Sequence, residues 1–180
     1  IMNHFNVVPG TIWLTGITAS GKTTLGNRLY ESLINKGVTN VEFLDGDELR
    51  KRLDKNYGNS LGDRFAVLKH IVEIASQCNQ NGKIIIVSTV SHKKKMREIA
   101  RQSIAHFIEV YLQCSIDVCA QRDYKGHYQK AFEGKYELFA GVTEPYETSK
   151  NPELVLNTDS LCKEECLQIL LEKSLEFLHQ

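Results

Sequence analysis

Short apolar runs alternate with helix-forming segments along most of this chain. Five runs rich in β-branched and aliphatic residues have the character of buried strands, namely residues 11–15, 41–45, 83–90, 107–112 and 154–156. Between and after them, helices are predicted at about 22–36, 47–53, 67–81, 93–103, 116–122 and 162–178, and apolar residues recur at helical spacing in the third and the last of these. Strands that alternate with helices predict an α/β fold with a parallel sheet flanked by helices.

Residues 123–148 interrupt this alternation. The segment is rich in Gly, Lys, Tyr and Glu and has no steady periodicity. A structureless segment of this length in a compact protein is usually functional, so we expect a lid over a site. Neither repeats nor linkers divide the chain, and residues 1–180 are predicted to form a single domain.

Residues 16–23 read Gly-Ile-Thr-Ala-Ser-Gly-Lys-Thr, a complete phosphate-loop pattern between a predicted strand and a predicted helix. Glycines let backbone N–H groups surround a phosphate, and the following helix adds the positive end of its dipole. Lys22 would reach the β- and γ-phosphates, and Thr23 would hold Mg²⁺. The motif predicts binding of a nucleoside triphosphate through Gly16, Ala19, Ser20, Gly21, Lys22, Thr23 and Thr24.

Further polar clusters fall where ligands bind such sheets, at the carboxyl ends of the strands. Asp45 and Asp47 follow the second strand, where carboxylates order Mg²⁺ or accept a proton, or else cap the next helix. Residues 88–91 follow the buried strand and bring Val90 and Ser91 to the same edge. Cations in and beside the lid suit phosphoryl transfer, and they are Arg122, Lys125, Lys130 and Lys135.

The composition of the chain indicates which classes of binding partner are not expected. Lys+Arg and Asp+Glu both number 22, so no net field favours nucleic acid or an anionic membrane. No apolar run is long enough to span a bilayer, no secretory signal is evident, and a cytoplasmic protein is expected. The five cysteines lack metal-binding spacing and are predicted to be reduced core residues, with Cys162 and Cys166 on one helix face. Residues 93–95, three lysines, are expected on a solvated helix face.

Several longer motifs occur in a fixed order after the phosphate loop. They are Phe-Leu-Asp-Gly-Asp at 43–47, Asp-Arg at 63–64, Phe-Ile-Glu-Val at 107–110, Gln-Arg-Asp-Tyr-Lys-Gly-His-Tyr at 121–128, Phe-Ala-Gly-Val at 139–142 and Asn-Pro-Glu-Leu-Val-Leu-Asn-Thr at 151–158. This order resembles the adenylyl-sulfate (APS) kinase family over about residues 9–159. The resemblance implies a P-loop kinase that transfers the γ-phosphate of ATP, with Mg²⁺, to the 3′-hydroxyl of adenylyl sulfate in sulfate assimilation. It also implies a homodimer.

By matched position, Asp47 would be the base beside that hydroxyl, Lys125 would reach the phosphates, and Arg122 would lie by the ATP adenine. Phe139 would stack on the acceptor base, while Ser91 matches a serine of the family. Catalysis is assigned to Lys22, Asp47 and Lys125, and metal binding to Thr23 and Asp45, although the sequence leaves open which of the two aspartates supports the metal. The residues expected to bind the acceptor are Asp47, Arg50, Asn59, Arg64, Val90, Ser91, Lys125 and Phe139.

The chain departs from the family pattern at Asn59, Val67 and His92, where the family has phenylalanine, asparagine and proline. A second acceptor therefore stays open, a pyrimidine nucleotide such as cytidine diphosphoramidate used in capsule modification, whose base edge Asn59 could bind. Two further alternatives are a small-metabolite kinase of the shikimate or gluconate type and a nucleotide-gated regulatory protein. Residues 35–38 lack the aspartate of a guanine-binding motif, and the 125–128 motif is not expected in the small-metabolite kinases.

Overall fold

The computed structural model describes residues 6–179, and its centre is a five-stranded parallel sheet in the order β2-β3-β1-β4-β5. The predicted α/β fold with a P-loop kinase-type sheet is confirmed. The strands lie close to the predicted runs and are β1 (Thr11–Thr15), β2 (Val41–Asp45), β3 (Ile84–Ser88), β4 (Phe107–Gln113) and β5 (Leu154–Asn157).

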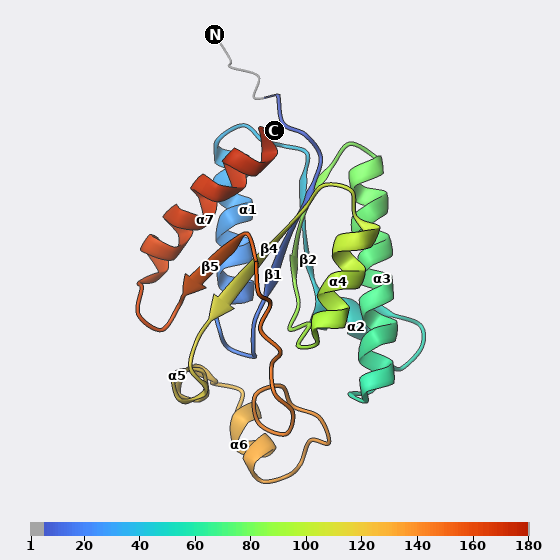
Figure 1. Cartoon of the computed structure of the whole chain (residues 1–180), viewed down its shortest axis with the longest axis vertical. Coiled ribbons are helices and arrows are strands. Elements are labelled where there is room, and N and C mark those ends of the chain that lie inside the picture. Colours follow the sequence, from blue (N-terminus) through green and yellow to red (C-terminus); the bar gives the residue numbers. More distant parts are fainter. Residues whose placement is uncertain (1–5, 180) are drawn as a thin grey trace.

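Helices cover both faces of this sheet (Figure 1). Helices α1 and α7 pack together on one face, and α3 and α4 pack together on the other. The short helices α2, α5 and α6 lie toward the carboxyl ends of the strands, and α6 belongs to the lid. The bounds are α1 (Lys22–Asn35), α2 (Gly46–Arg52), α3 (Leu61–Gln80), α4 (Lys94–Ser103), α5 (Ile116–Arg122), α6 (His127–Phe132) and α7 (Lys163–Leu178).

The central strands β1 and β3 are mostly apolar because both of their faces are buried. In β1, Ile12 and Leu14 join the core under α1 and α7, whereas Trp13 joins the core under α3 and α4. The residues of β3 divide in the same alternating way, since successive side chains of a strand point to opposite faces. A smaller third core lies in the lid and contains Tyr128 and Phe139.

The lid contains one helix that the sequence analysis did not predict. Helix α6 begins after Gly126, whose φ of 71° is the left-handed conformation that glycine adopts readily. It buries Tyr128 and Ala131, one turn apart, in the lid core. Its six residues are too few to show a period, which is why the pattern read as loop. Helix α3 also starts earlier than predicted, because the hydroxyl of Ser60 caps it by accepting from Asp63 N at 3.1 Å.

Two predictions about individual side chains were wrong. Cys162 is exposed rather than part of the core, because it is the N-cap of α7, where its Sγ accepts from Glu165 N at 3.4 Å. The other four cysteines are buried, as predicted. Lys93 is not solvated like Lys94 and Lys95, because its ammonium lies 3.0 Å from Glu144 of the lid. No helix among residues 6–179 is long and apolar enough to cross a membrane.

Candidate active site

The phosphate loop connects β1 to α1, and its backbone is held in conformations that curl it. Ala19 and Gly21 have φ values of 64° and 106°. At Gly16 a Cβ atom would lie 2.8 Å from both the Leu112 carbonyl oxygen and Ser20 Oγ, so a side chain does not fit there. Ser20 Oγ is buried without a hydrogen-bond partner among the described residues, so it is a polar atom left for a ligand to satisfy.

Lys22 lies inside this loop and is only 9% exposed. Its Nζ donates to the carbonyl oxygen of Ile17 at 2.9 Å. Burial lowers the pKa of Lys22 to about 8, and the negative charges of Asp47 and Asp45 oppose that effect. An ammonium group held in a curled loop of N–H donors is suited to binding the phosphates of a nucleotide.

The lid and its surroundings hold the phosphate loop from outside. Tyr128, in α6, donates from its hydroxyl to the carbonyl oxygen of Thr18 at 2.6 Å. Thr158, after β5, donates from Oγ1 to the carbonyl oxygen of Ser20 at 2.7 Å. Arg122 donates to the carbonyl oxygen of Thr158 at 2.5 Å, so it is connected to the loop through Thr158. One lid residue, Tyr128, and one residue after β5, Thr158, therefore contact the phosphate loop directly.

The two predicted carboxylates have different surroundings. Asp45 caps α2, since its Oδ1 accepts from the backbone N–H groups of Asp47 and Glu48 at 2.9 and 3.3 Å. Its other oxygen accepts from Thr23 Oγ1 at 2.9 Å, which joins β2 to the phosphate loop. Asp45 thus serves as a helix cap and as an oxygen donor beside Thr23 at the same time. Asp47 is exposed and lines the neighbouring pocket instead.

That pocket lies between α2, α3 and the loop after β3, and encloses about 50 Å³. Two of its lining residues, Val67 and His92, are the positions at which the chain departs from the family pattern. Its lining also contains five of the residues predicted to bind the acceptor, namely Asp47, Arg50, Arg64, Val90 and Ser91. Burial lowers the pKa of Arg64, and the positive charge of Arg50 lowers it further. Two cations that share a small pocket are suited to an anionic ligand.

Three residues predicted to bind the acceptor do not line this pocket. Asn59 contacts the two arginines from outside the pocket. Its side-chain oxygen accepts from Arg50 Nη1, and its carbonyl oxygen accepts from Arg64 Nε at 3.2 Å. Phe139 is 8% exposed and stacks on Tyr136 in the lid core, with ring centroids 5.6 Å apart. Lys125 is exposed on the lid. Their contacts with a bound nucleotide remain predictions.

The sequence analysis missed a buried arginine that connects the pocket to the lid. Arg97, in α4, is 2% exposed and donates to the carbonyl oxygen of Ser91 at 2.5 Å. It also donates to Ser149 Oγ at 3.0 Å and to the carbonyl oxygen of Glu147, on the segment that returns from the lid. Its guanidinium lies over the ring of Tyr146 at 4.8 Å. The available signal was position, because Arg97 lies on the same helix face as the buried Met96 and Ala100.

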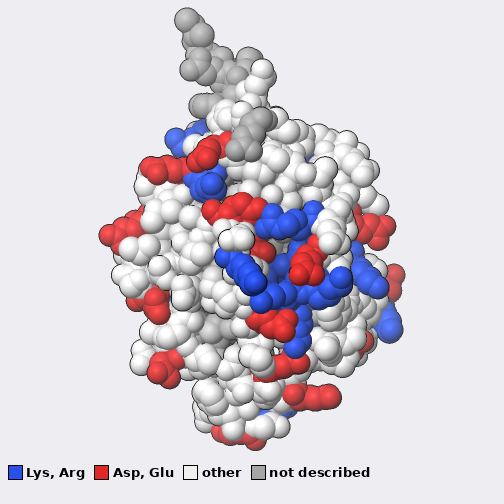
Figure 2. All heavy atoms as spheres, in the orientation of Figure 1, with Lys and Arg blue, Asp and Glu red and all other residues white. Residues whose placement is uncertain are grey.

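Around that arginine, exposed cations gather on the surface that carries α4, with acidic residues among them (Figure 2). Lys94, Lys95 and Arg101 are exposed there. Beneath them, Glu109 of β4 is 3% exposed and lies 3.7 Å from Arg97 Nε. Arg101, one of these exposed cations, also lies 4.0 Å from Glu109, so the surface charge adjoins the buried pair.

The phosphate loop at the end of β1, the lid above it and the parallel sheet define a P-loop kinase. The family model described as Adenylylsulphate kinase matches residues 8–157. The chain belongs to the adenylylsulphate kinase family, as the sequence motifs predicted, and is a phosphotransferase with an alcohol-group acceptor. Because the members of this family are kinases, the membership argues against the nucleotide-gated regulatory protein considered from the sequence.

Individual relatives agree with this assignment. A probable adenylyl-sulfate kinase of Archaeoglobus fulgidus is 44% identical over 148 residues, which cover 82% of this chain and 95% of that protein. The adenylyl-sulfate kinase of Bacillus pumilus is 40% identical over 165 residues, 91% of this chain and 83% of that protein. The APS kinase of Mycobacterium tuberculosis, solved in complex with AMPPNP and APS, has a TM-score of 0.82 at 31% identity and covers 91% of this chain and 96% of that chain.

Proposed function

We propose that this protein transfers the γ-phosphate of ATP to the 3′-hydroxyl of adenylyl sulfate, giving 3′-phosphoadenylyl sulfate and ADP in sulfate assimilation. The observation that carries the proposal is the position of Asp47. This carboxylate lines the pocket with Arg50 and Arg64, and its charge also acts on Lys22 in the phosphate loop. One group therefore faces both the acceptor pocket and the phosphate site. The relatives named as adenylyl-sulfate kinases support this acceptor.

In the reaction, the acceptor 3′-oxygen forms a bond to the γ-phosphorus while the bond from that phosphorus to the β–γ bridging oxygen breaks. Asp47 takes the hydroxyl proton, and ADP leaves. Lys22 offsets the charge on the transferred group, and Lys125 and Arg122 approach from the lid side. Arg50 and Arg64 hold the anionic 5′ group of the acceptor, which relieves the repulsion between them.

A Mg²⁺ ion fits the donors beside the phosphate loop. Thr23 Oγ1 and Asp45 Oδ2 are 2.9 Å apart, and both are the hard oxygen donors that Mg²⁺ prefers. Among residues 6–179 no group of three or more His, Cys, Asp or Glu could form a metal site. Mg²⁺ typically keeps several waters and binds through one or two protein oxygens plus substrate phosphates, so the two donors suffice. When bound, the ion supplies charge neutralisation at the phosphates.

The pyrimidine acceptor gains no support from the site. It was suggested by a base contact from Asn59, but the side-chain oxygen of Asn59 accepts from Arg50. Asn59 also lies outside the pocket lining. A cytoplasmic location and a homodimer, both expected from the sequence, remain part of the proposal.

The decisive experiment measures ADP formation with ATP and Mg²⁺ in the presence of adenylyl sulfate, cytidine diphosphoramidate or neither. We expect kcat/KM to favour adenylyl sulfate strongly, with the new phosphate on the 3′-oxygen of the product. Lys22→Ala should abolish turnover, whereas Lys36→Ala, on an exposed lysine just beyond α1, should not. A preference for cytidine diphosphoramidate, or no stimulation by either nucleotide, would overturn the proposal.

A further inference from the structure

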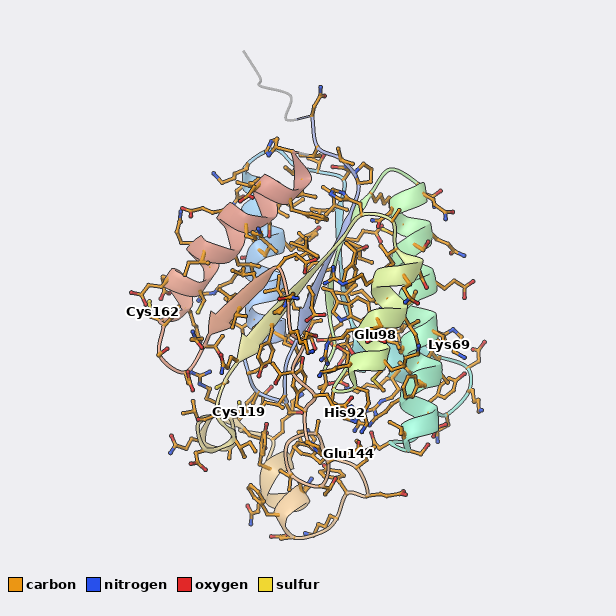
Figure 3. All side chains as sticks on the ribbon, viewed as in Figure 1. Lys69, His92, Glu98, Cys119, Glu144 and Cys162 are labelled. Carbon is orange, nitrogen blue, oxygen red and sulfur yellow. The ribbon has the colours of Figure 1, made fainter. Side chains whose placement is uncertain are left out.

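A histidine of the acceptor pocket is bound directly to the lid. His92 lines the pocket, and its side chain is 1% exposed. Its Nε2 lies 2.6 Å from Oε2 of Glu144 (Figure 3). The other carboxylate oxygen of Glu144 lies 3.0 Å from Lys93 Nζ. Both oxygens of this lid carboxylate are therefore held by the loop that follows β3.

The direction of the histidine hydrogen bond follows from the charge of its partner. Although partial burial opposes it, hydrogen bonds from His92 and Lys93 lower the pKa of Glu144, so this group is an ionised, acceptor-only carboxylate at neutral pH. Nε2 of His92 is therefore the donor. Burial lowers the pKa of His92 and so favours the neutral ring, although the charge and hydrogen bond of Glu144 oppose this effect. Glu144 thereby selects one tautomer of His92.

Glu144 in turn closes a turn that carries Phe139. Its carbonyl oxygen accepts from Gly141 N at 2.7 Å, and the hydroxyl of Thr143 accepts from Phe139 N at 2.7 Å. A parallel backbone contact strengthens the connection, since Glu147 N donates to the carbonyl oxygen of His92 at 2.8 Å. Residues 139–144 thus form one hydrogen-bonded turn with Glu144, and Glu144 contacts His92 of the pocket.

We propose that His92 is a positioning residue for the acceptor, which holds the 139–144 turn of the lid against the acceptor pocket through Glu144. The inference rests on the proposed function, because the acceptor is the nucleotide whose binding is measured. A proline, which the resemblance leads one to expect at this position, has no side-chain donor for such a contact. Loss of the contact between His92 and Glu144 should raise the KM for the acceptor more than the KM for ATP. The reason is that His92 lines the acceptor pocket and makes none of the described hydrogen bonds to the phosphate loop.

The test compares KM for adenylyl sulfate and for ATP in a set of variants. His92→Leu fills the space of the ring with an apolar side chain that has no donor, and should raise the acceptor KM about 10- to 100-fold, the range expected for a hydrogen bond to a charged group. Glu144→Ala should do the same, and the double variant should be no worse than either single variant. His92→Gln restores a donor and should return the KM to within about threefold of the original. The KM for ATP should stay within about twofold throughout.

The matched control is Glu153→Ala. Glu153 is also a carboxylate on the segment returning from the lid and pairs with Arg101 of α4, but it is outside the pocket. This variant should leave the acceptor KM unchanged. Equal increases in both KM values, additive effects of the two single substitutions, or no rescue by glutamine would overturn the inference.

Hydrogen exchange separates this inference from the proposed function. In the protein without nucleotides, His92→Leu should accelerate exchange of the amides in residues 139–147, and His92→Gln should not. Unchanged exchange in His92→Leu would overturn the inference even if adenylyl sulfate is the acceptor. Accelerated exchange in a protein that does not use adenylyl sulfate would overturn the proposed function and leave the connection between His92 and the lid intact.

Discussion

The hydroxyl of Tyr128 donates a 2.6 Å hydrogen bond to the backbone carbonyl oxygen of Thr18. Tyr128 belongs to a lid helix and Thr18 to the phosphate loop, so the lid is fastened to the loop that it covers. Burial raises the pKa of Tyr128 far above its usual value, which keeps the hydroxyl protonated as a donor. The loop conformation therefore depends on a residue 110 positions away in the chain.

Tyr128→Phe tests this contact with little change of shape. The Thr18 carbonyl would lose its donor, so we expect the free energy of unfolding to fall by about 0.5–1.5 kcal/mol. Because the phosphate loop is then held less firmly, the KM for ATP should rise more than the KM for the acceptor. Urea unfolding and steady-state kinetics measure the two effects. Tyr30→Phe is the control, since Tyr30 packs against the main core far from the lid. An unchanged ATP KM would contradict the coupling.

Asp47→Asn and Asp45→Asn should differ in their kinetics. Asp47 is the proposed base, so its amide should lower kcat by about 10²- to 10⁴-fold with little change in the KM for ATP. Asp45 touches Thr23, so its amide should mainly weaken the use of MgATP. Asparagine caps helices about as well as aspartate, which preserves α2 in the second variant. The same kinetic effect from both substitutions would contradict the assignment of roles.

Lys22 should make the ligand-free protein less stable at neutral pH than a variant without this charge. Burial lowers the pKa of Lys22 to about 8 from 10.5, so between these values the unfolded chain binds more protons than the folded one. The free energy of unfolding therefore rises with pH across that window, and the burial penalty is complete below it. Lys22→Met should be more stable by roughly 1–3 kcal/mol at pH 7, and the advantage should vanish near pH 10.5. Denaturant unfolding of both proteins across this range measures the difference, and a difference that grows with pH would contradict the prediction.

Arg97→Met should be strongly destabilising because it leaves Glu109 buried beside only the more distant Arg101. Removal of one partner of a buried ion pair typically costs about 3–5 kcal/mol. The double variant Arg97→Met with Glu109→Gln should lose less than the sum of the two single variants, since no buried charge remains unpaired. Urea unfolding of the four proteins gives this coupling. Simple additivity would show that the pair does not act as a unit.

Much of the fold could be predicted from local patterns. The strand runs and the spacing of apolar residues in α3 and α7 identified the alternation. A strand buried on both faces is continuously apolar, and a helix that packs on a sheet has an apolar stripe. Helix α6 was missed because six residues do not define a period. Cys162 was misplaced because a capping role depends on where the helix begins, and helix ends are the least certain part of such a prediction.

The candidate site likewise has one part that the local sequence predicts and another part that it does not. Residues 16–23 identify a phosphate site by themselves because a curled loop of N–H donors needs glycines at fixed positions and a following helix. The acceptor pocket combines α2, α3 and the loop after β3, and no local pattern reveals that Arg50 and Arg64 share it. The sequence also did not reveal that Tyr136 stacks on one face of the Phe139 ring, the ring that was predicted to stack on the acceptor base.

The sequence by itself determined the family, the parallel α/β architecture and the phosphate loop, because these depend on short-range periodicity and on motifs of adjacent residues. Only the tertiary structure decided which distant residues act together. The contacts of Arg97 with Ser91 and Glu147, of His92 with Glu144 and of Tyr128 with Thr18 join segments that are far apart in the chain or belong to different elements. Such contacts form because folding brings the carboxyl ends of the parallel strands to one edge, where each buried polar group must find a partner.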